Sequence, residues 1–229
     1  MSEPLNLVFD LDGTLIDSAP QIHAAANIVF VNNGFSPLSQ EAIRGFIGNG
    51  VGVLVSRSMA HLGIDPDAAL HAELVGSFVR IYEEAFDLTT LYPGVSTALT
   101  ELSAAGHRLA ICTNKPLGPT RAVLGHFGLS ALFPVVIGGD SLPQRKPDPA
   151  PLRAALQALG PGKALFIGDS EVDAETARAA GVPLVLFSGG YRKTAAEMLG
   201  ATTIFDDHAA LPGLIDQLAP GLQAARAGN

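Results

Sequence analysis

The stretch VFDLDGTLIDS, residues 8–18, decides how this chain is interpreted. Val8 and Phe9 are the apolar residues that a buried strand needs, yet Asp10 and Asp12 follow them at once. Burying a carboxylate is costly unless something compensates its charge, and two neighbouring carboxylates raise each other's pKa. Either water or a cation must therefore stabilise this pair.

The composition is that of a folded protein with an acidic surface. A length of 229 residues suits one large domain with an insertion, and a hydrophobic content of 48% argues against disorder. The formal net charge of -8 argues against a nucleic-acid partner, which would require a basic surface. A small anionic substrate stays possible, because a local site can be positive on an acidic protein.

The sequence carries no sign of export or of a membrane partner. Cys112 is its one cysteine, so no internal disulfide can form. The first residues lack the basic region and apolar run of a signal peptide, and no apolar stretch approaches the roughly 20 residues that span a bilayer. We therefore expect a cytoplasmic protein, either a monomer or a homodimer.

Short apolar runs alternate with helical patterns along most of the chain. The runs are residues 5–9, 108–112, 135–137, 164–167 and 183–187, and the helical patterns cover residues 118–128, 149–159 and 171–180. Continuous apolar runs are typical of strands that are covered on both faces. The fold class is therefore predicted to be α/β, with a Rossmann-like parallel sheet between two layers of helices.

The alternation fails between residues 17 and 90, where the chain reads as helix after helix. The strongest of these helices, residues 66–86, repeats apolar side chains at helical spacing: Leu70, Leu74, Phe78 and Ile81. Asp65 is its expected N-cap, with Pro66 at the first helical position. We therefore expect residues 17–90 to form an inserted helical cap domain on a core domain of residues 1–16 and 91–229.

Polar side chains follow four of the predicted strands. They are Asp10, Asp12 and Thr14 after the first strand, with Gly13 between the last two, Thr113, Asn114 and Lys115 after the second, Arg145 and Lys146 after the third, and Asp169, Ser170 and Asp173 after the fourth. Ligands of open α/β sheets bind beyond the carboxyl ends of the strands. These side chains are therefore expected to meet at one edge of the sheet.

The chemistry of this edge suits a metal and a phosphoryl group. Carboxylates without clustered His or Cys are hard oxygen ligands, which select Mg²⁺. Such an ion would neutralise Asp10, Asp12 and Asp169. A lysine and a hydroxyl beside it suit phosphoryl oxygens, and a carboxylate can accept the group as an aspartyl-phosphate. A second carboxyl two residues away can act first as an acid and then as a base.

The arrangement resembles the haloacid dehalogenase superfamily of phosphohydrolases. The residues that carry the resemblance are Asp10-Leu11-Asp12-Gly13-Thr14-Leu15 for the first motif, Thr113 for the second, Lys146 within Arg145-Lys146-Pro147 for the third, and Gly168-Asp169 with Asp173 for the fourth. All four motifs stand in the family's order and cover nearly the whole chain.

This resemblance implies a role for each motif residue. Asp10 would be the nucleophile, and Asp12 would be the general acid and base, with its backbone carbonyl on Mg²⁺. Asp169 would bind the metal and Asp173 would support that site. The phosphoryl oxygens would be held by Thr113, Asn114 and Lys146. The helical segment would be a mobile cap that closes over the site and excludes water.

Within this superfamily the sequence is most similar to the phosphoglycolate phosphatases. The similar stretches are residues 17–20, 47–50, 91–95, 112–116 and 190–191. The resemblance implies hydrolysis of 2-phosphoglycolate, a small phosphorylated metabolite, to glycolate and phosphate. Relatives that act on other small phosphates, including an amino-sugar phosphate, share similar stretches, so a sugar or amino-sugar phosphate remains an alternative substrate.

The carboxylate of such a substrate needs a partner besides the phosphate site. Backbone amides of Gly48, Asn49 and Gly50 in the cap are candidates. Arg44 is a candidate guanidinium, since arginine binds carboxylates through two parallel hydrogen bonds.

Each motif also has an ordinary structural explanation. Asp-Gly is a common turn pair, Lys146 could be a solvated surface lysine, and Thr113, Asp169 and Asp173 could cap helices. Residues 48–50 could simply turn between two helices. Only the occurrence of all the motifs at strand ends favours a catalytic site.

Other activities on a parallel sheet fit the residues less well or remain open. A dehalogenase would not need an acid at Asp12, because halide leaves unprotonated. A catalytically silent binding module would be expected to lack one of the motif residues. A nicotinamide enzyme would carry G-x-G-x-x-G after its first strand. A phosphomutase shares the aspartyl-phosphate and stays open.

Overall fold

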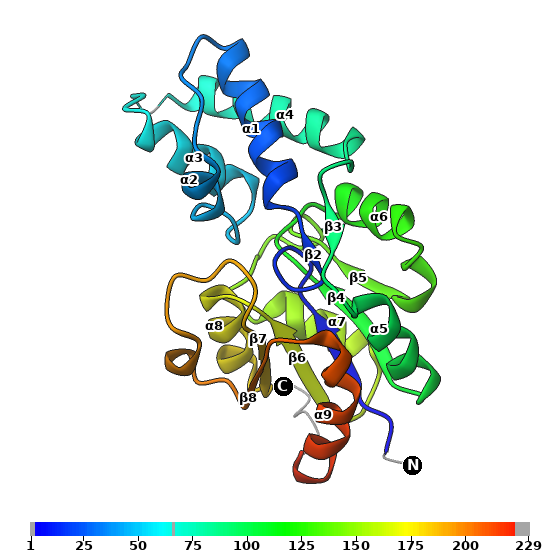
Figure 1. Ribbon diagram of the computed structural model, residues 1–229. Helices are drawn as coiled ribbons and strands as arrows, with labels where there is room; N and C mark the ends of the chain where they lie inside the picture. Colours follow the sequence, from blue (N-terminus) through cyan, green and yellow to red (C-terminus); the bar gives the residue numbers. More distant parts are fainter. Residues whose placement is uncertain (1–2, 66, 223–229) are drawn as a thin grey trace.

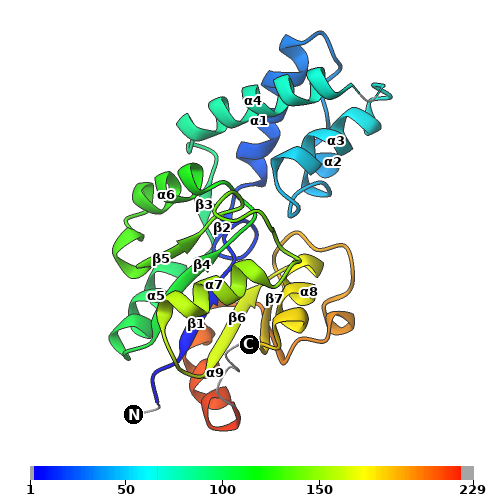
Figure 2. The same ribbon diagram turned by 180° about the vertical axis from the view of Figure 1, so that it is seen from behind.

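The computed structural model describes residues 3–65 and 67–222. An α/β core carries a helical cap above the carboxyl end of its sheet (Figures 1 and 2). None of the described helices combines the length and the hydropathy that crossing a bilayer requires.

Six parallel strands form the sheet of the core. In spatial order they are β5 (Val135–Ile137), β4 (Arg108–Cys112), β1 (Asn6–Phe9), β6 (Ala164–Gly168), β7 (Leu184–Phe187) and β8 (Thr203–Phe205). At its end β1 pairs Phe9 with Ile111 on one side and with Ile167 on the other. The three central strands therefore end at the same level, which confirms the predicted parallel α/β sheet.

The two faces of the sheet are covered by different helices. On one face α5 (Val95–Ala104), α6 (Leu117–His126) and α9 (Leu211–Leu218) pack against Leu7 and Phe9. On the other face α7 (Ala150–Leu159) and α8 (Glu171–Ala180) pack against Val8. Successive strand residues point to opposite faces, so β1, which is covered on both sides, is apolar except for the buried Asn6.

The cap contains four helices with a hydrophobic core of their own. They are α1 (Ala19–Asn32), α2 (Gln40–Arg44), α3 (Val51–His61) and α4 (Ala68–Glu84). Their core is built from side chains such as Ile22, Phe30, Val55, Leu74 and Phe78. A hydrophobic core of its own is a property expected of a separate domain. The domain boundaries at residues 17 and 90 stay a prediction.

A short antiparallel ribbon connects the cap to the core. The chain enters the cap through β2 (Ile16–Asp17) and leaves it through β3 (Thr90–Leu91), with Ile16 opposite Leu91 and Asp17 opposite Thr90. The sequence did not predict this pair, because two residues per strand are too few to show an alternating pattern. Residues 3–65 and 67–222 also include four short 3₁₀ helices: η1 (Ser130–Leu132), η2 (Ala196–Leu199), η3 (His208–Ala210) and η4 (Ala219–Gly221).

The start of α4 corrects one expectation. Oδ1 of Asp67 accepts a hydrogen bond from the backbone N–H of Leu70 at 2.7 Å, which is the geometry of an N-cap. The predicted N-cap, Asp65, was therefore wrong by two residues. Pro66 lies outside the described residues. Asp65 and Asp67 stand on either side of Pro66 in the sequence, so composition alone did not show which of them caps the helix.

Candidate active site

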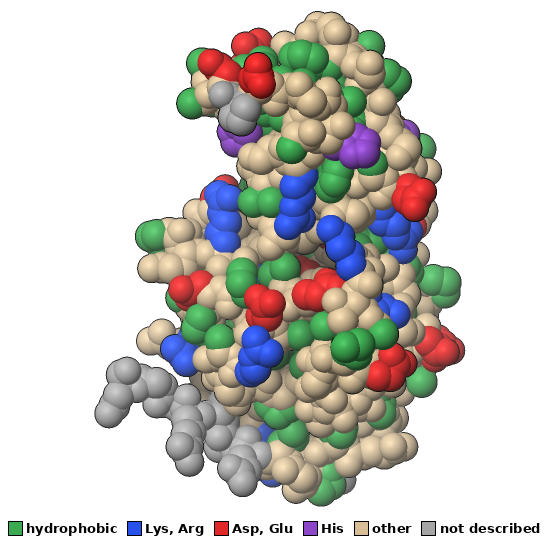
Figure 3. Space-filling model, turned by 90° about the vertical axis from the view of Figure 1, so that its left-hand side faces the viewer, with side chains coloured by type: hydrophobic (Ala, Val, Ile, Leu, Met, Phe, Trp, Pro, Cys, Tyr) green, Lys and Arg blue, Asp and Glu red, His purple; other side chains and the backbone are tan. Residues whose placement is uncertain are grey.

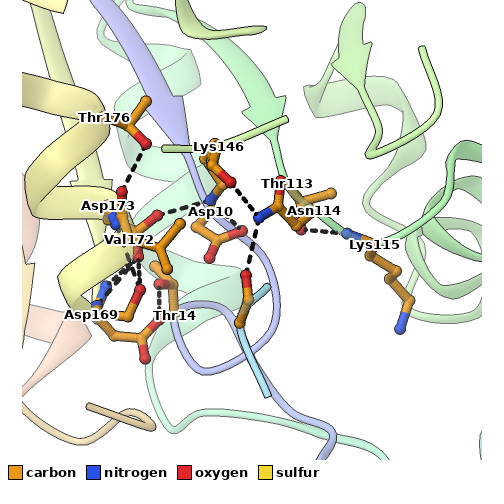
Figure 4. A network of polar contacts seen from close by, with 12 residues as sticks. Asp10, Thr14, Thr113, Asn114, Lys115, Lys146, Asp169, Val172, Asp173 and Thr176 are labelled. Carbon is orange, nitrogen blue, oxygen red and sulfur yellow. Dashed lines mark hydrogen bonds and ion pairs between the residues drawn. The ribbon is translucent and has the colours of Figure 1, made fainter. Parts of the chain in front are cut away.

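The side chains of Asp10, Lys146 and Asp173 meet at the carboxyl end of β1 (Figure 4). The Lys146 Nζ lies 3.0 Å from Oδ1 of Asp10 and 2.7 Å from Oδ1 of Asp173. All three residues are buried. Burial disfavours the ammonium, but the two carboxylates outweigh it and raise the pKa of Lys146 above its ordinary value. Lys146 therefore stays charged at this edge of the sheet.

Three carboxylates form a compact group around this lysine. Asp10, Asp169 and Asp173 each offer one oxygen, and these oxygens lie within 4.8 Å of one another. Burial and the nearby Asp173 raise the pKa of Asp10 to about 7, although Lys146 opposes this shift. Burial, Asp173 and Asp10 likewise hold the pKa of Asp169 well above its usual range. The charge of Lys146 therefore does not fully offset the burial and mutual repulsion of the three carboxylates.

The Oδ1 atom of Asp10 indicates where a metal ion fits beside Lys146. Oδ1 of Asp10 is buried and accepts no hydrogen bond within the described part of the chain, since Lys146 lies close to it without hydrogen-bond geometry. The available ligand atoms are all oxygens, which are the ligands of hard divalent ions such as Mg²⁺. The residues present therefore fit the expected metal, and Asp10 and Asp169 are candidates for its side-chain ligands.

Asp169 is fixed by two loops that reach it from neighbouring strand ends. Its Oδ1 accepts a hydrogen bond from Oγ1 of Thr14 at 2.7 Å, and its Oδ2 accepts one from the backbone N–H of Tyr191 at 2.7 Å. A Cβ at Gly13 would lie 2.6 Å from Oδ2 of Asp169, and one at Gly190 would lie 2.1 Å from it. Both positions therefore need glycine so that the loops can approach the carboxylate.

Asp173 uses both of its oxygens inside the protein. Oδ1 contacts Lys146, and Oδ2 accepts hydrogen bonds from the backbone N–H groups of Asp169 and Ser170 and from the Ser170 hydroxyl. Asp173 stands in the first turn of α8 and forms a capping box with Ser170. Its geometry is that of a residue that orients Lys146 and the Asp169 loop.

Asp12 lies apart from the three-carboxylate group. Its Oδ1 accepts a hydrogen bond from the Ser18 hydroxyl at 2.6 Å and one from the Lys115 ammonium at 3.3 Å. Asp12 lines the cavity between cap and core, and 15% of its side chain is exposed. The carboxylate is thus positioned to face a substrate, and it does not join the group of three acids that fits a metal.

Asn114 ties the cap loop to the core. Its side-chain amide donates hydrogen bonds to the carbonyl oxygens of Gly48 and Lys146, both at 2.9 Å. A Cβ at Gly139 would lie 2.2 Å from the Asn114 carbonyl oxygen, so the turn after β5 must be glycine there. The neighbouring Thr113 is buried and lines the cavity with its hydroxyl-bearing side chain.

A cavity between cap and core holds most of the predicted substrate-binding residues. It is lined by Asp10, Asp12, Ile22, Ile47, Gly48, Gly50, Val51, Leu54, Phe78, Tyr82, Thr113, Asn114, Lys115 and Pro116. On the face shown in Figure 3, Lys and Arg side chains gather at the level where the cap meets the core. Charge therefore concentrates at the junction, while the cavity walls themselves are mostly apolar.

Arg44 and Asn49 do not belong to this lining. The Arg44 guanidinium donates a hydrogen bond to the Gly190 carbonyl at 3.1 Å and lies 4.9 Å from the centre of the Tyr191 ring. It therefore links α2 of the cap to the loop after β7. Gly48 and Gly50 do reach the cavity, with φ angles of 113° and 85° that favour glycine.

Lys115 is the side chain whose importance the sequence alone did not reveal. It follows Asn114, is buried, and contacts Asp12 of the core and the Tyr82 hydroxyl of the cap. Its Nζ also lies 3.9 Å from the centre of the Tyr82 ring. Burial lowers the pKa of Lys115, and Asp12 opposes this shift. In the sequence, the one signal that could have identified Lys115 as a functional residue was its place just after a predicted strand.

Comparison with known proteins assigns the family. The family model described as haloacid dehalogenase-like hydrolase matches residues 7–187, which is most of the chain. The chain belongs to the haloacid dehalogenase-like hydrolases. The resemblance of its motifs to this family is thereby confirmed.

Individual relatives of this haloacid dehalogenase-like hydrolase carry a more specific name. A phosphoglycolate phosphatase of Cereibacter sphaeroides is 51% identical over 213 residues, covering 93% of this chain and 98% of that protein. A phosphoglycolate phosphatase of Rhodospirillum rubrum is 42% identical over 225 residues, covering 95% of this chain and 93% of that protein. The chain is accordingly an enzyme of the phosphoric monoester hydrolase class.

Solved structures of haloacid dehalogenase-like hydrolases share the whole architecture. A crystal structure described as a predicted phosphoglycolate phosphatase from Haemophilus somnus is 32% identical, with a TM-score of 0.88, and covers 93% of this chain and 99% of that one. CbbY from Rhodobacter sphaeroides in complex with phosphate is 29% identical, with a TM-score of 0.75, and covers 92% of this chain and 96% of that one. The likeness therefore includes both the sheet and the cap.

Proposed function

We propose that this enzyme hydrolyses 2-phosphoglycolate to glycolate and phosphate, with Mg²⁺, through an aspartyl-phosphate on Asp10. The observation that carries the proposal is the Asp10 carboxylate. One of its oxygens is buried 3.0 Å from the Lys146 ammonium and accepts no hydrogen bond of good geometry within the described residues, and the residue lines the same cavity as Asp12. A carboxylate held in this way is available to attack phosphorus.

The roles of the other side chains follow from their positions around Asp10. The Lys146 ammonium, 3.0 Å from Asp10, and the Thr113 hydroxyl would hold oxygens of the phosphoryl group. A carboxylate oxygen of Asp10 forms a bond to phosphorus as the bond to the ester oxygen breaks. Asp12 gives its proton to that oxygen, and then takes one from the water that hydrolyses the acyl phosphate.

The metal would be held by Asp10 and Asp169, with the backbone carbonyl of Asp12 as the ligand that family resemblance adds. When bound, Mg²⁺ supplies positive charge beside the phosphoryl oxygens and relieves the repulsion between them and the carboxylates. Asp173 would contribute by keeping Lys146 and the Asp169 loop in place, since both of its oxygens already accept hydrogen bonds or an ion pair.

The cavity walls support a small substrate. Ile22, Ile47, Val51, Leu54 and Phe78 form much of the lining. The hydroxyl groups of a sugar phosphate would lose their hydrogen bonds to water against these side chains, which costs free energy. A two-carbon phosphate ester has no such groups. Helix α3 begins at Val51 on the cavity wall, and a helix N-terminus favours negative charge.

A panel of phosphate esters tests the proposal. The purified protein with Mg²⁺ is given 2-phosphoglycolate, glucose 6-phosphate and glucosamine 6-phosphate, and phosphate release is measured. We expect kcat/KM for 2-phosphoglycolate to exceed the others by at least ~10-fold, which corresponds to about 1.4 kcal/mol. Equal turnover of all three esters would mean a generalist phosphatase, and isomerised sugar phosphate without net phosphate release would mean a phosphomutase.

A further inference from the structure

Two lysines lie near the reacting groups, and they face different parts of a substrate. Lys146 is held between Asp10 and Asp173 and is not part of the cavity lining. Lys115 does line the cavity, and among the described residues of that lining it alone carries a positive charge. In Figure 4 its ammonium points away from Lys146. The two cations therefore act on separate groups.

The partners of the Lys115 ammonium leave it able to bind an anion. It contacts Oδ1 of Asp12 at 3.3 Å, which is long for a charged hydrogen bond, and the Tyr82 hydroxyl. An ammonium has three donors, so these two contacts leave one for a ligand. Only 3% of the Lys115 side chain is exposed, and an ion pair is much stronger in such a site than in water.

The position of Asp12 fixes where the leaving group must lie. Asp12 is the proposed donor of a proton to the ester oxygen, so that oxygen must come within hydrogen-bond distance of its carboxyl group. In 2-phosphoglycolate the carboxylate carbon is two bonds beyond the ester oxygen, about 2.4 Å away by ordinary bond lengths. Lys115 Nζ lies 3.3 Å from Oδ1 of Asp12. The substrate carboxylate therefore falls within reach of Lys115.

Arg44 is the cation that the sequence favoured for this task, but its guanidinium is used elsewhere. It donates to the carbonyl oxygens of Gly189 and Gly190, at 3.5 and 3.1 Å, and lies outside the cavity lining. To reach the substrate it would have to leave these carbonyls and the Tyr191 ring. Lys115 needs no such movement.

We propose that Lys115 binds the carboxylate of the substrate, and that this ion pair selects phosphate esters with an acidic group next to the ester carbon. The inference rests on the proposed function and deepens it. Lys115 belongs to the core, whereas Tyr82, which packs on its ammonium, belongs to α4 of the cap. Tyr82 is a positioning residue, and the carboxylate site is complete only while the cap lies on the core.

Matched substrates separate this role from an indirect effect on catalysis. Lys115→Met keeps the apolar stem and removes the charge, and ethyl phosphate matches 2-phosphoglycolate except for the carboxylate. We expect Lys115→Met to lower kcat/KM for 2-phosphoglycolate by about 100-fold, mainly through KM, because a buried charge loses its partner. For ethyl phosphate, which has no carboxylate to lose, the same substitution should change kcat/KM by less than about 5-fold. Lys115→Arg should restore part of the loss.

Binding without turnover gives a second measurement. We expect 3-phosphonopropionate, an uncleavable analogue with the carboxylate, to bind wild type more tightly than propylphosphonate, and Lys115→Met to remove that difference. Lys163→Met is the matched control, because Lys163 pairs with Glu3 at 3.1 Å just before β6, at the opposite end of the sheet. If Lys115→Met does not fold, as judged by circular dichroism, Lys115→Gln and Lys115→Arg are compared by the same titrations.

Three results would overturn or redirect the inference. Equal losses for 2-phosphoglycolate and ethyl phosphate would mean that Lys115 acts only through Asp12. Unchanged kinetics for both esters would mean that the ammonium does not touch the substrate. Wild type that uses ethyl phosphate as well as 2-phosphoglycolate would contradict the proposed function itself, whatever the variants do.

Discussion

The core and the cap hold their functional residues in different ways. At the sheet edge Asp169 is fixed by a hydroxyl, a backbone amide and two glycines that allow close approach. The cap contributes mainly apolar side chains to the cavity, with Tyr82 as a polar exception. A phosphoryl group requires charge at fixed positions, whereas a small substrate can be selected by shape and by what the walls exclude. We therefore expect the chemistry to depend on directed contacts of the core, and the size of an accepted substrate to depend on the packing of the cap.

The largest effect should come from the core, at the proposed nucleophile. Asp10→Asn keeps the size of the side chain and removes the attacking oxygen. We expect kcat to fall by at least ~10⁴-fold with every phosphate ester, because removing a nucleophile stops the covalent route. Phosphate release by a purified sample checks this. A variant that retains even a tenth of the activity would contradict an aspartyl-phosphate on Asp10.

Metal removal should abolish activity and make the stability of the protein depend on pH, because the carboxylates then repel one another. The folded protein without metal holds the Asp10 pKa near 7, above the ordinary value of 3.8, so between these pH values it binds more protons than the unfolded chain. Its stability should therefore fall as pH rises from about 4 to 7. Thermal unfolding after EDTA treatment, at several pH values, measures this fall.

Mg²⁺ should raise the melting temperature most at pH 7 and least near pH 4, where Asp10 is protonated. Asp10→Asn is the control, because it removes the titrating group and should weaken the pH dependence. Equal stabilisation by Mg²⁺ at both pH values would contradict a metal site that includes Asp10.

A smaller effect is expected where the loop after β7 meets the start of the cap. The Tyr191 hydroxyl accepts hydrogen bonds from the backbone N–H groups of Ser18 and Ala19 and donates one to Asp17. Tyr191→Phe would leave the buried Ser18 N–H without its acceptor and the Ala19 N–H with only Oδ1 of Asp17 at 3.3 Å, at a cost of about 1–3 kcal/mol. That corresponds to a melting temperature lower by roughly 2–10 °C for a chain of this size.

Tyr92→Phe is the matched control for Tyr191→Phe. Among the described residues the Tyr92 hydroxyl donates one weak hydrogen bond, at 3.5 Å, to the Gly189 carbonyl, and it also lies near the Tyr191 hydroxyl. Its loss should change the free energy of unfolding by less than about 0.5 kcal/mol, as for most surface substitutions. If the two variants melt at the same temperature, the Tyr191 hydroxyl does not stabilise the start of α1.

The smallest effect should come from the cap, at Arg44. Because its guanidinium contacts Gly190 and the Tyr191 ring, Arg44→Ala should change KM for 2-phosphoglycolate and for ethyl phosphate alike, by less than about 5-fold. Steady-state kinetics with both esters measure the ratio. If KM rises for 2-phosphoglycolate alone, Arg44 binds the substrate carboxylate. Selectivity would then depend on a charged group of the cap.

The sequence was most informative about the core, for a physical reason. Strands 5–9 and 164–167 are apolar except for Asn6, because helices cover both of their faces, so their ends are sharp and Asp10 and Asp169 fall at the same edge. The edge strand β8 escaped prediction, because only Phe205 of its three residues is buried and Ile204 is 38% exposed. A short, half-covered strand has no pattern that distinguishes it from a loop.

The contacts between cap and core were the part that sequence could not predict. Arg44 and Lys115 are both cations near motif residues, and their place in the chain does not tell which one faces the cavity. That depends on how α2 and α4 sit on the sheet, and so on tertiary packing. The position of Lys115 two residues after Thr113, at a strand end, was the signal available, and it was too general to assign a role.

The ribbon of β2 and β3 allows the cap to be replaced by a different insertion without disturbing the core. The chain leaves the core at Asp17 and returns at Thr90, and these two residues are paired neighbours. An insertion whose ends lie together can be replaced by one of different length without displacing the strands below it. New substrates can therefore arise by altering what lies between these two points, while the machinery that cleaves the phosphate ester is left untouched.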